Sequence, residues 1–140
     1  MGVLSDFFIA DRSPVPNYNG GDTVSALDKC QFKAITPLQA AQFLAVLRGK
    51  DYSVDMVREF RLVTPEDAEE WTMSVPDDMA GKLAALNTDQ IPELAAKFSI
   101  ATGEELGWSP GDFVPVVNEL VALARRAKET GKVMYLWNSL

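Results

Sequence analysis

The stretch Ser109–Trp137, SPGDFVPVVNELVALARRAKETGKVMYLW, predicts a long amphipathic helix followed by a strand. Ser109 and Pro110 are typical of a helix start, and Gly131 is typical of a helix end. Between them, apolar residues recur at helical spacing and predict the buried side of the longest helix. These residues are Phe113, Val116, Val117, Leu120, Leu123, Ala124 and Ala127. The run Lys132–Trp137 is apolar on both faces and predicts a buried strand.

Elements of both kinds are also predicted upstream of this stretch. Strands are expected at Val3–Ala10, Lys29–Ile35 and Trp71–Val75. Helices are expected to begin at Thr36-Pro37, Thr64-Pro65, Pro76 and Thr88, and the last two should form a helical hairpin. The segment Tyr52–Val63 fits either a helix or a strand. This order predicts a single α+β domain over residues 1–140, with four to five helices packed on a sheet of three to four strands.

The composition is that of a soluble globular domain. The chain has 140 residues, of which 47% are hydrophobic and 24% are charged. No apolar run approaches the roughly 20 residues that a membrane-spanning helix needs. The segment Met1–Ala10 lacks the basic region of a secretion signal. The single cysteine, Cys30, cannot form an internal disulfide, and together these features predict a cytoplasmic protein.

The charged residues exclude several classes of chemistry. The sequence has no histidine, so neither a Ser-His-Asp triad nor a Cys-His pair can form within the chain. One cysteine and no histidine cannot supply a conventional zinc site, whereas a carboxylate site for Mg²⁺ or Ca²⁺ stays open. The formal net charge of −7 disfavours binding to nucleic acid or to an anionic membrane. We therefore expect no cofactor, no nucleic acid and no membrane partner.

The carboxylates are clustered along the chain. Glu66 and Asp67, like Asp77 and Asp78, lie where helices are expected to begin, and acids in that position stabilise the helix dipole. Glu69 and Glu70 extend the first of these groups. Glu104 and Glu105 differ, because they lie with Trp108 in the predicted loop Gly103–Gly111. An aromatic residue and two acids in a loop form a candidate binding site, although a solvated loop is the simpler explanation.

Aromatic residues mark the predicted last strand. Alternation places Tyr135 and Trp137 on the same strand face as Val133. If helices cover that face, these side chains are core; if helices do not, they form an aromatic binding surface. The candidate binding surface therefore comprises Glu104, Glu105, Trp108, Tyr135 and Trp137.

Two further groups have simpler structural explanations. Cys30 has no histidine to act as its base, and cysteine is often buried. Arg125, Arg126 and Lys128 could bind an anionic ligand, but they also suit the negative end of the predicted long helix.

Scattered segments over most of the chain carry a resemblance to other proteins. They are Asp6–Phe8, Thr36-Pro37, Met79–Leu86, Thr88–Phe98, Thr102–Glu105 with Trp108, Ala122–Ala127, Gly131-Lys132 and Tyr135–Trp137. In these segments the chain resembles a group of small uncharacterised bacterial proteins of unknown function. The resemblance implies a bacterial, cytoplasmic domain, and it transfers no cofactor and no site residue.

Three functional hypotheses follow. The absence of histidine and of a recognisable catalytic motif favours a non-catalytic domain that recognises a protein partner, as an acidic immunity protein recognises a basic toxin. The alternative is a small-ligand-binding protein or a carboxylate-dependent enzyme, which would need two acids to converge in a cleft. A third possibility is a homo-oligomer that uses the aromatic C-terminal strand.

Overall fold

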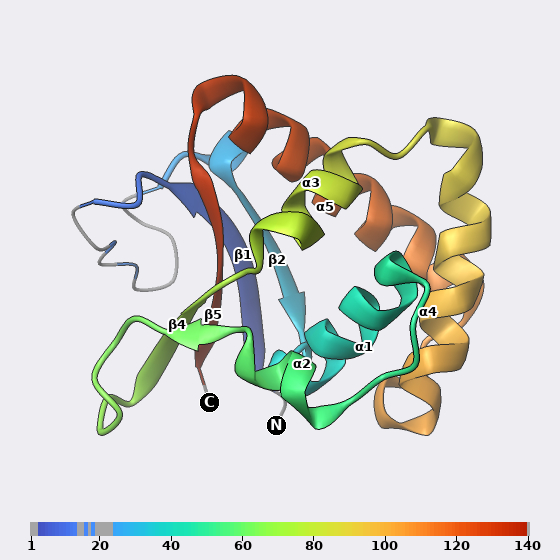
Figure 1. Cartoon of the computed structure of the whole chain (residues 1–140), viewed down its shortest axis with the longest axis horizontal. Helices are drawn as coiled ribbons and strands as arrows, with labels where there is room; N and C mark the ends of the chain where they lie inside the picture. Colours follow the sequence, from blue (N-terminus) through green and yellow to red (C-terminus); the bar gives the residue numbers. More distant parts are fainter. Residues whose placement is uncertain (1–2, 14–15, 17, 19–23, 140) are drawn as a thin grey trace.

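Strand β5 (Val133–Ser139), which the C-terminal run predicts, lies inside the sheet with a neighbour on each side (Figure 1). The structure is a computed structural model that describes residues 3–13, 16, 18 and 24–139, without the side chain of Glu104. The strand order is β2-β1-β5-β4-β3, and every neighbouring pair is antiparallel. The other strands are β1 (Leu4–Ala10), β2 (Lys29–Lys33), β3 (Arg61–Leu62) and β4 (Glu70–Ser74).

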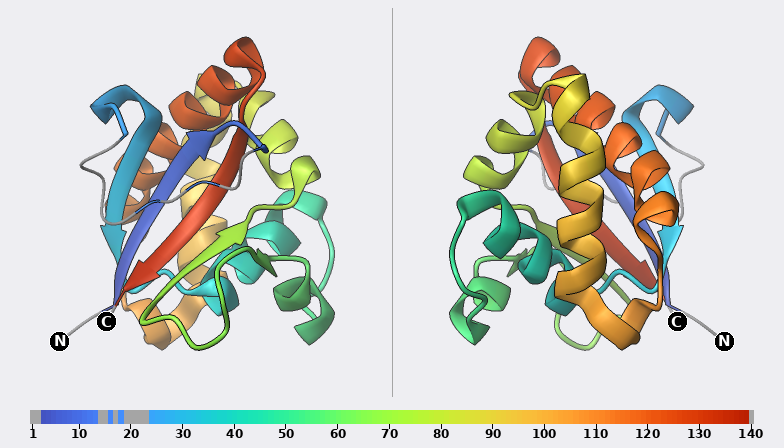
Figure 2. Two further views of the ribbon diagram at one scale, coloured as in Figure 1. Left: turned by 90° about the vertical axis from the view of Figure 1, so that its left-hand side faces the viewer. Right: turned by 90° about the vertical axis from the view of Figure 1, so that its right-hand side faces the viewer.

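The helices lie on one face of this sheet (Figure 2). They are α1 (Pro37–Arg48), α2 (Val54–Arg58), α3 (Asp77–Ala84), α4 (Ile91–Leu106) and α5 (Pro110–Thr130), and two short 3-10 turns, η1 (Ala26–Asp28) and η2 (Thr88–Gln90), complete the set in the described residues. Helix α5 contacts β1, β2 and β5, and α4 packs on α5 and α1. In the described part of the chain, no helix combines the length and apolarity needed to cross a membrane.

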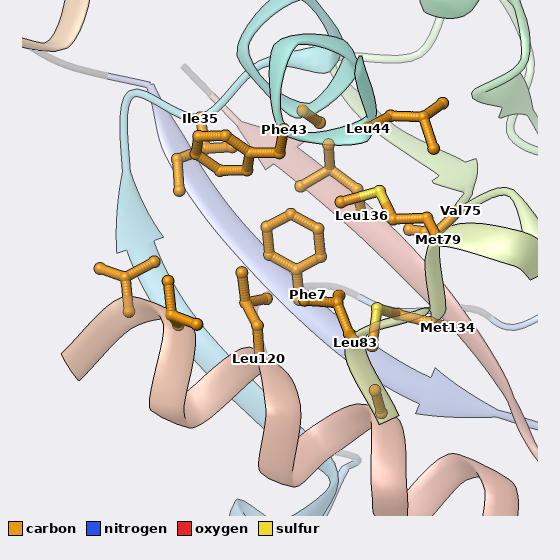
Figure 3. Close-up of a cluster of buried hydrophobic side chains, with 14 of the residues drawn as sticks. Phe7, Ile35, Phe43, Leu44, Val75, Met79, Leu83, Leu120, Met134 and Leu136 are labelled. Carbon is orange, nitrogen blue, oxygen red and sulfur yellow. The ribbon is translucent and has the colours of Figure 1, made fainter. Parts of the chain in front are cut away.

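The main core fills the space between the sheet and the helices (Figure 3). Alternation turns Phe7 of β1 and Leu136 of β5 toward the helices, where they pack among residues such as Phe43 and Leu120. Phe43 stacks on Phe98 of α4 with ring centroids 4.3 Å apart. Each fully buried side chain of the size of leucine or phenylalanine contributes about 1.5–3 kcal/mol of hydrophobic free energy. This core is therefore the main source of stability.

The predicted start of α1 is confirmed, as are the predicted start and end of α5. The backbone N–H of Thr36 donates to Gln39 Oε1 at 3.0 Å, which satisfies a donor at the start of α1. Helix α5 begins in the same way, because the N–H of Asp112 donates to Ser109 Oγ at 3.2 Å. Gly49 ends α1 in the left-handed conformation, with φ of 66°.

The predicted strand count of three to four is too low, because the sheet has five strands in the described residues. The ambiguous segment Tyr52–Val63 contains both α2 and the two-residue strand β3, which is too short to give an alternation pattern. The helix predicted at Thr64-Pro65 is wrong. The short connection between β3 and β4 makes a turn there, in which the N–H of Ala68 donates to the carbonyl of Pro65 at 3.1 Å.

The predicted loop Gly103–Gly111 is also shorter than expected. Helix α4 is broken at Gly103, where φ is 54° and ψ is −138°, and the chain then continues as one more turn to Leu106.

The packing of the helices also differs from the prediction. Helix α4, which follows η2, packs against α5 and α1, whereas α3 packs against α5 and β5. The hairpin predicted for the helices that begin at Pro76 and Thr88 is therefore wrong: α4 packs along α5, the other long helix, and not along α3.

Candidate binding surface on the second face of the sheet

The second face of the sheet, which we call the helix-free face, carries its own set of side chains. The strand registers place Asp6 opposite Trp137, Phe8 opposite Tyr135, and Thr72 opposite Trp137. Alternation turns all of these side chains away from the main core. No described helix covers this face, so Tyr135 and Trp137 occupy the position that the sequence hypothesis of an aromatic surface requires.

These side chains are nevertheless buried, because they form a small second core. Tyr18 stacks on Phe8 with centroids 4.1 Å apart and meets the edge of Trp137 at 5.4 Å. Phe8 in turn stacks on Tyr135 at 5.3 Å. Tyr135 and Trp137 are each only 3% exposed. Strand β5 is also hydrogen-bonded on both sides, so it offers no free edge to a second copy of the chain.

Asp6 is a buried carboxylate at the edge of this aromatic cluster. Its Oδ2 accepts hydrogen bonds from Tyr18 Oη at 2.6 Å and from Gln31 Nε2 at 3.1 Å. Burial raises the pKa of Tyr18 far above its usual value, and the hydrogen bond and negative charge of Asp6 raise it further. Tyr18 therefore stays protonated and donates to Asp6, which anchors Tyr18 to the sheet.

Two buried polar atoms on the helix-free face have no hydrogen-bond partner among the described residues. They are Oγ1 of Thr72, whose residue is 0% exposed, and Nε1 of Trp137. An unsatisfied buried donor or acceptor costs about 1–3 kcal/mol. A bound group that completes one of these bonds would recover part of that cost, so such atoms indicate where a ligand could be held.

A cavity of about 510 Å³ lies beside Thr72. It is bordered by Tyr18 on one side and by the connection between β3 and β4 on the other, including Thr64, Glu69 and Glu70. Glu70 and Thr72 are two residues apart on β4, so both side chains lie on the helix-free face. The volume falls within the range of about 300–1,000 Å³ that is usual for ligand sites.

The acidic hairpin, which we define as residues 61–74, supplies the charge at this cavity. Among the described residues, the side chains of Glu66, Asp67, Glu69 and Glu70 make no hydrogen bond or ion pair. Several acids elsewhere are paired: Arg48 binds both Glu59 at 2.7 Å and Asp78 at 2.8 Å. No ion pair in the described part of the fold therefore neutralises these four carboxylates.

A second hollow, of about 370 Å³, lies at the other end of β4 and β5. Arg12, Arg61, Ser74 and Tyr135 border it together with acids. Burial raises the pKa of Tyr135, and the nearby charge of Arg12 opposes that rise. Charges of both signs line this hollow, and Arg12 already pairs with Asp77 at 3.3 Å. Its electrostatics select no single class of ligand.

The structure divides the predicted binding surface between two places. Tyr135 and Trp137 lie on the helix-free face, whereas Glu105 and Trp108 lie among the helices. Glu105 accepts a hydrogen bond from Gln39 Nε2 at 3.0 Å, and the ring of Trp108 lies 5.2 Å from that of Phe113. The side chain of Glu104 lies outside the described residues. Trp108 is therefore part of the packing between α4 and α5.

Sequence reasoning missed Tyr18 and Thr72 in the cavity wall, and it did not place the acid Glu70 on a strand beside them. Tyr18 lies in a stretch rich in Pro, Asn and Gly that carries no periodic signal. Thr72 lies within the predicted strand Trp71–Val75, but one polar residue in a strand gives no sign that its hydroxyl lacks a partner. Glu70 extends the acidic group at the helix predicted from Thr64-Pro65, and this interpretation gives no sign that Glu70 begins strand β4 beside Thr72.

Burial or contacts within the fold account for Cys30, Arg125 and Arg126. Cys30 is buried, and burial raises the pKa of its thiol, which is the opposite of what a nucleophile needs. Arg125 donates to the carbonyl of Ala84 at 3.2 Å and so satisfies the end of α3. Arg126 and Lys132 both bind Asp28.

Two further observations concern metal binding and the similarity of the chain to known proteins. Within the described residues, no group of three or more acidic or cysteine side chains is arranged to hold a metal ion. No protein-family model, no curated protein and no solved structure matches the chain.

Proposed function

We propose that this protein is a non-catalytic bacterial binding domain that recognises a basic protein partner in the cytoplasm through the acidic hairpin. The observation that carries the proposal is the set of four hairpin carboxylates that no described residue neutralises. Exposed charge without an internal partner is suited to steering and orienting an oppositely charged protein. The net charge of −7 adds a long-range attraction between the whole protein and a basic partner.

The class of partner follows from the same charges. Nucleic acid and anionic membranes are repelled by an acidic surface, whereas a basic protein is attracted. A toxin enzyme with a basic surface is one such partner, and a protein that binds it would act as an immunity protein. The carboxylate-dependent enzyme is not proposed. Glu69 and Glu70 do border one cavity, but the rest of its described wall supplies no further acid or base except Tyr18, whose hydroxyl donates to Asp6.

The experiment compares three forms of the full chain as baits for native cell lysate at physiological salt. They are the natural protein, a hairpin variant (Glu66→Gln, Asp67→Asn, Glu69→Gln, Glu70→Gln), and a control with four helical acids neutralised (Asp89→Asn, Glu93→Gln, Glu119→Gln, Glu129→Gln). We expect a basic protein to be retained by the natural chain and the control and lost by the hairpin variant.

Capture is followed by mapping of the contact. Hydrogen–deuterium exchange of the purified pair is expected to show protection of residues 61–74. Protection confined to the helices, equal loss from both variants, or no captured basic protein would each contradict the proposal. This design separates a specific site from general attraction to an acidic protein, because both variants change the net charge equally.

A further inference from the structure

We propose that the cavity beneath the acidic hairpin receives one arginine side chain of the partner. The inference rests on the proposed function and names the chemical group that the hairpin recognises. Two independent observations meet at this cavity. One is the pair Glu69 and Glu70 at its border, which no described residue neutralises. The other is Thr72, fully buried and without a hydrogen-bond partner among the described residues, which borders the same space.

The polarity of the cavity wall defines the charge of its occupant. Glu69, Glu70 and the hydroxyl of Thr72 all offer acceptors, and no Lys or Arg side chain borders the cavity in the described structure. The hydroxyl of Thr64 is already engaged, because it accepts from the N–H of Thr72 at 3.2 Å. A ligand that satisfies this wall must carry positive charge and several N–H donors.

The arrangement of these acceptors favours a guanidinium over an ammonium. A guanidinium presents five N–H donors in a rigid plane, so it can bind a carboxylate with two parallel bonds and still reach a further acceptor. Glu70 and Thr72 project from the same strand face two residues apart, which suits such a planar group. The ring of Tyr18 borders the same cavity, and aromatic rings attract guanidinium groups.

Hydrogen bonding and ring packing fix the side chain of Tyr18 at the cavity wall, where its ring could contact a guanidinium. Its hydroxyl donates to the buried Asp6, and its ring stacks on Phe8 and meets the edge of Trp137. The wall opposite the hairpin is thus anchored to the sheet by a hydrogen bond as well as by packing. A partner arginine would enter between this anchored ring and the carboxylates, and the hairpin side of the wall would have to shift for the guanidinium to reach the buried hydroxyl of Thr72.

The test measures binding of three capped tripeptides to the ¹⁵N-labelled full chain by NMR titration. They are Gly-Arg-Gly, Gly-Lys-Gly and Gly-citrulline-Gly, and citrulline keeps the shape of arginine without its charge. We expect the arginine peptide to shift the amide signals of residues 64–72 and to bind about tenfold more tightly than citrulline. The lysine peptide is expected to bind more weakly than the arginine peptide.

Two variants test the named atoms. Glu70→Gln is expected to weaken the arginine peptide about tenfold, and Thr72→Val about threefold. Thr72→Val removes an unpartnered hydroxyl and retains the branched shape, so the variant should fold at least as stably as the natural chain. Glu129→Gln on α5 makes the same charge change on the other face of the sheet and should leave binding unchanged.

The outcomes separate this inference from the proposed function. If a peptide of five Lys-Gly repeats shifts the hairpin signals, but arginine shows no preference and Thr72→Val has no effect, the arginine site is wrong and the basic-partner proposal stands. If neither the lysine repeats nor the arginine peptide shifts residues 61–74, both are wrong. Equal weakening by Glu129→Gln and Glu70→Gln would show general charge attraction and would overturn the arginine site.

Discussion

At the scale of the residue, Asp28 shows how a single carboxylate joins distant parts of the chain. Its side chain is only 11% exposed and is bound by Arg126 of α5 and by Lys132, whose Nζ lies 3.4 Å from Asp28 Oδ2. Arg126 and Lys132 together lower the pKa of this carboxyl, with the hydrogen bond from Arg126 as the largest cause, although burial opposes the shift. The two ion pairs of Asp28 therefore fix η1 to the end of α5.

The lowered pKa of Asp28 predicts a pH-dependent contribution to stability. A carboxyl whose pKa is lower in the folded state stabilises the fold above its unfolded pKa, and it loses this effect as the pH falls through the folded pKa. Asp28→Asn should lower the free energy of unfolding by about 1–2 kcal/mol at neutral pH. The difference from the natural chain should shrink in strong acid, and urea denaturation at several pH values measures it.

Asp89→Asn is the control for this experiment, because Asp89 is exposed in η2 and has no ion pair in the described residues. It should change the unfolding free energy little at any pH. A loss in Asp28→Asn that persists unchanged in acid would show that the effect comes from packing and not from the charge of Asp28.

At the scale of the element, two glycines occupy similar space but different backbone conformations. Added Cβ atoms at Gly81 in α3 and at Gly103 in α4 would both meet nothing within 4 Å. Gly81 is helical, whereas Gly103 has φ of 54° and ψ of −138° and breaks α4. Replacing either glycine by alanine would therefore cause no steric clash, and its effect on stability would come from the backbone conformation alone.

This contrast predicts opposite effects for the same substitution. Gly103→Ala should lower the free energy of unfolding by about 1–3 kcal/mol, because only glycine adopts that conformation without strain. Gly81→Ala should raise it by about 0.5–1 kcal/mol, because alanine loses less entropy in a helix. Chemical denaturation of both variants measures the difference. Equal effects of the same sign would contradict the backbone explanation.

The elements that the sequence predicted well are those with local signals. The helix from Pro37 to Arg48 has a cap, a proline and a terminal glycine, and it forms as predicted. The strand β3 has two residues and exists only because β4 pairs with it, so nothing local marks it. The turn at Gly103 is a case where a loop signal was correct in place but wrong in extent, since one helical turn follows the break.

At the scale of the whole molecule, the candidate site depends on the strand order, which no local pattern reveals. Alternation predicted correctly that Tyr135 and Trp137 share a face. It could not show that Thr72 lies opposite Trp137, or that Tyr18 packs on Phe8 and Trp137, because these contacts join segments far apart in the sequence. The cavity beside Thr72 is therefore a tertiary feature, and the sequence supplied only its acids.

The uneven placement of charge leads to the last prediction. Four hairpin carboxylates lie within five residues, from Glu66 to Glu70, and have no partner in the described residues, so they repel one another in the folded state. Neutralising all four with amides should raise the free energy of unfolding by about 1 kcal/mol at low salt. The gain should fade at about 1 M salt, where the Debye length is about 3 Å.

Neutralising Asp55 and Asp77, which pair with Arg58 and Arg12, should give no such gain. Denaturant titrations at low and high salt measure both variants. A hairpin whose neutralisation weakens the fold at low salt would mean that its acids serve stability, and the case for a partner that compensates them would lose its physical basis.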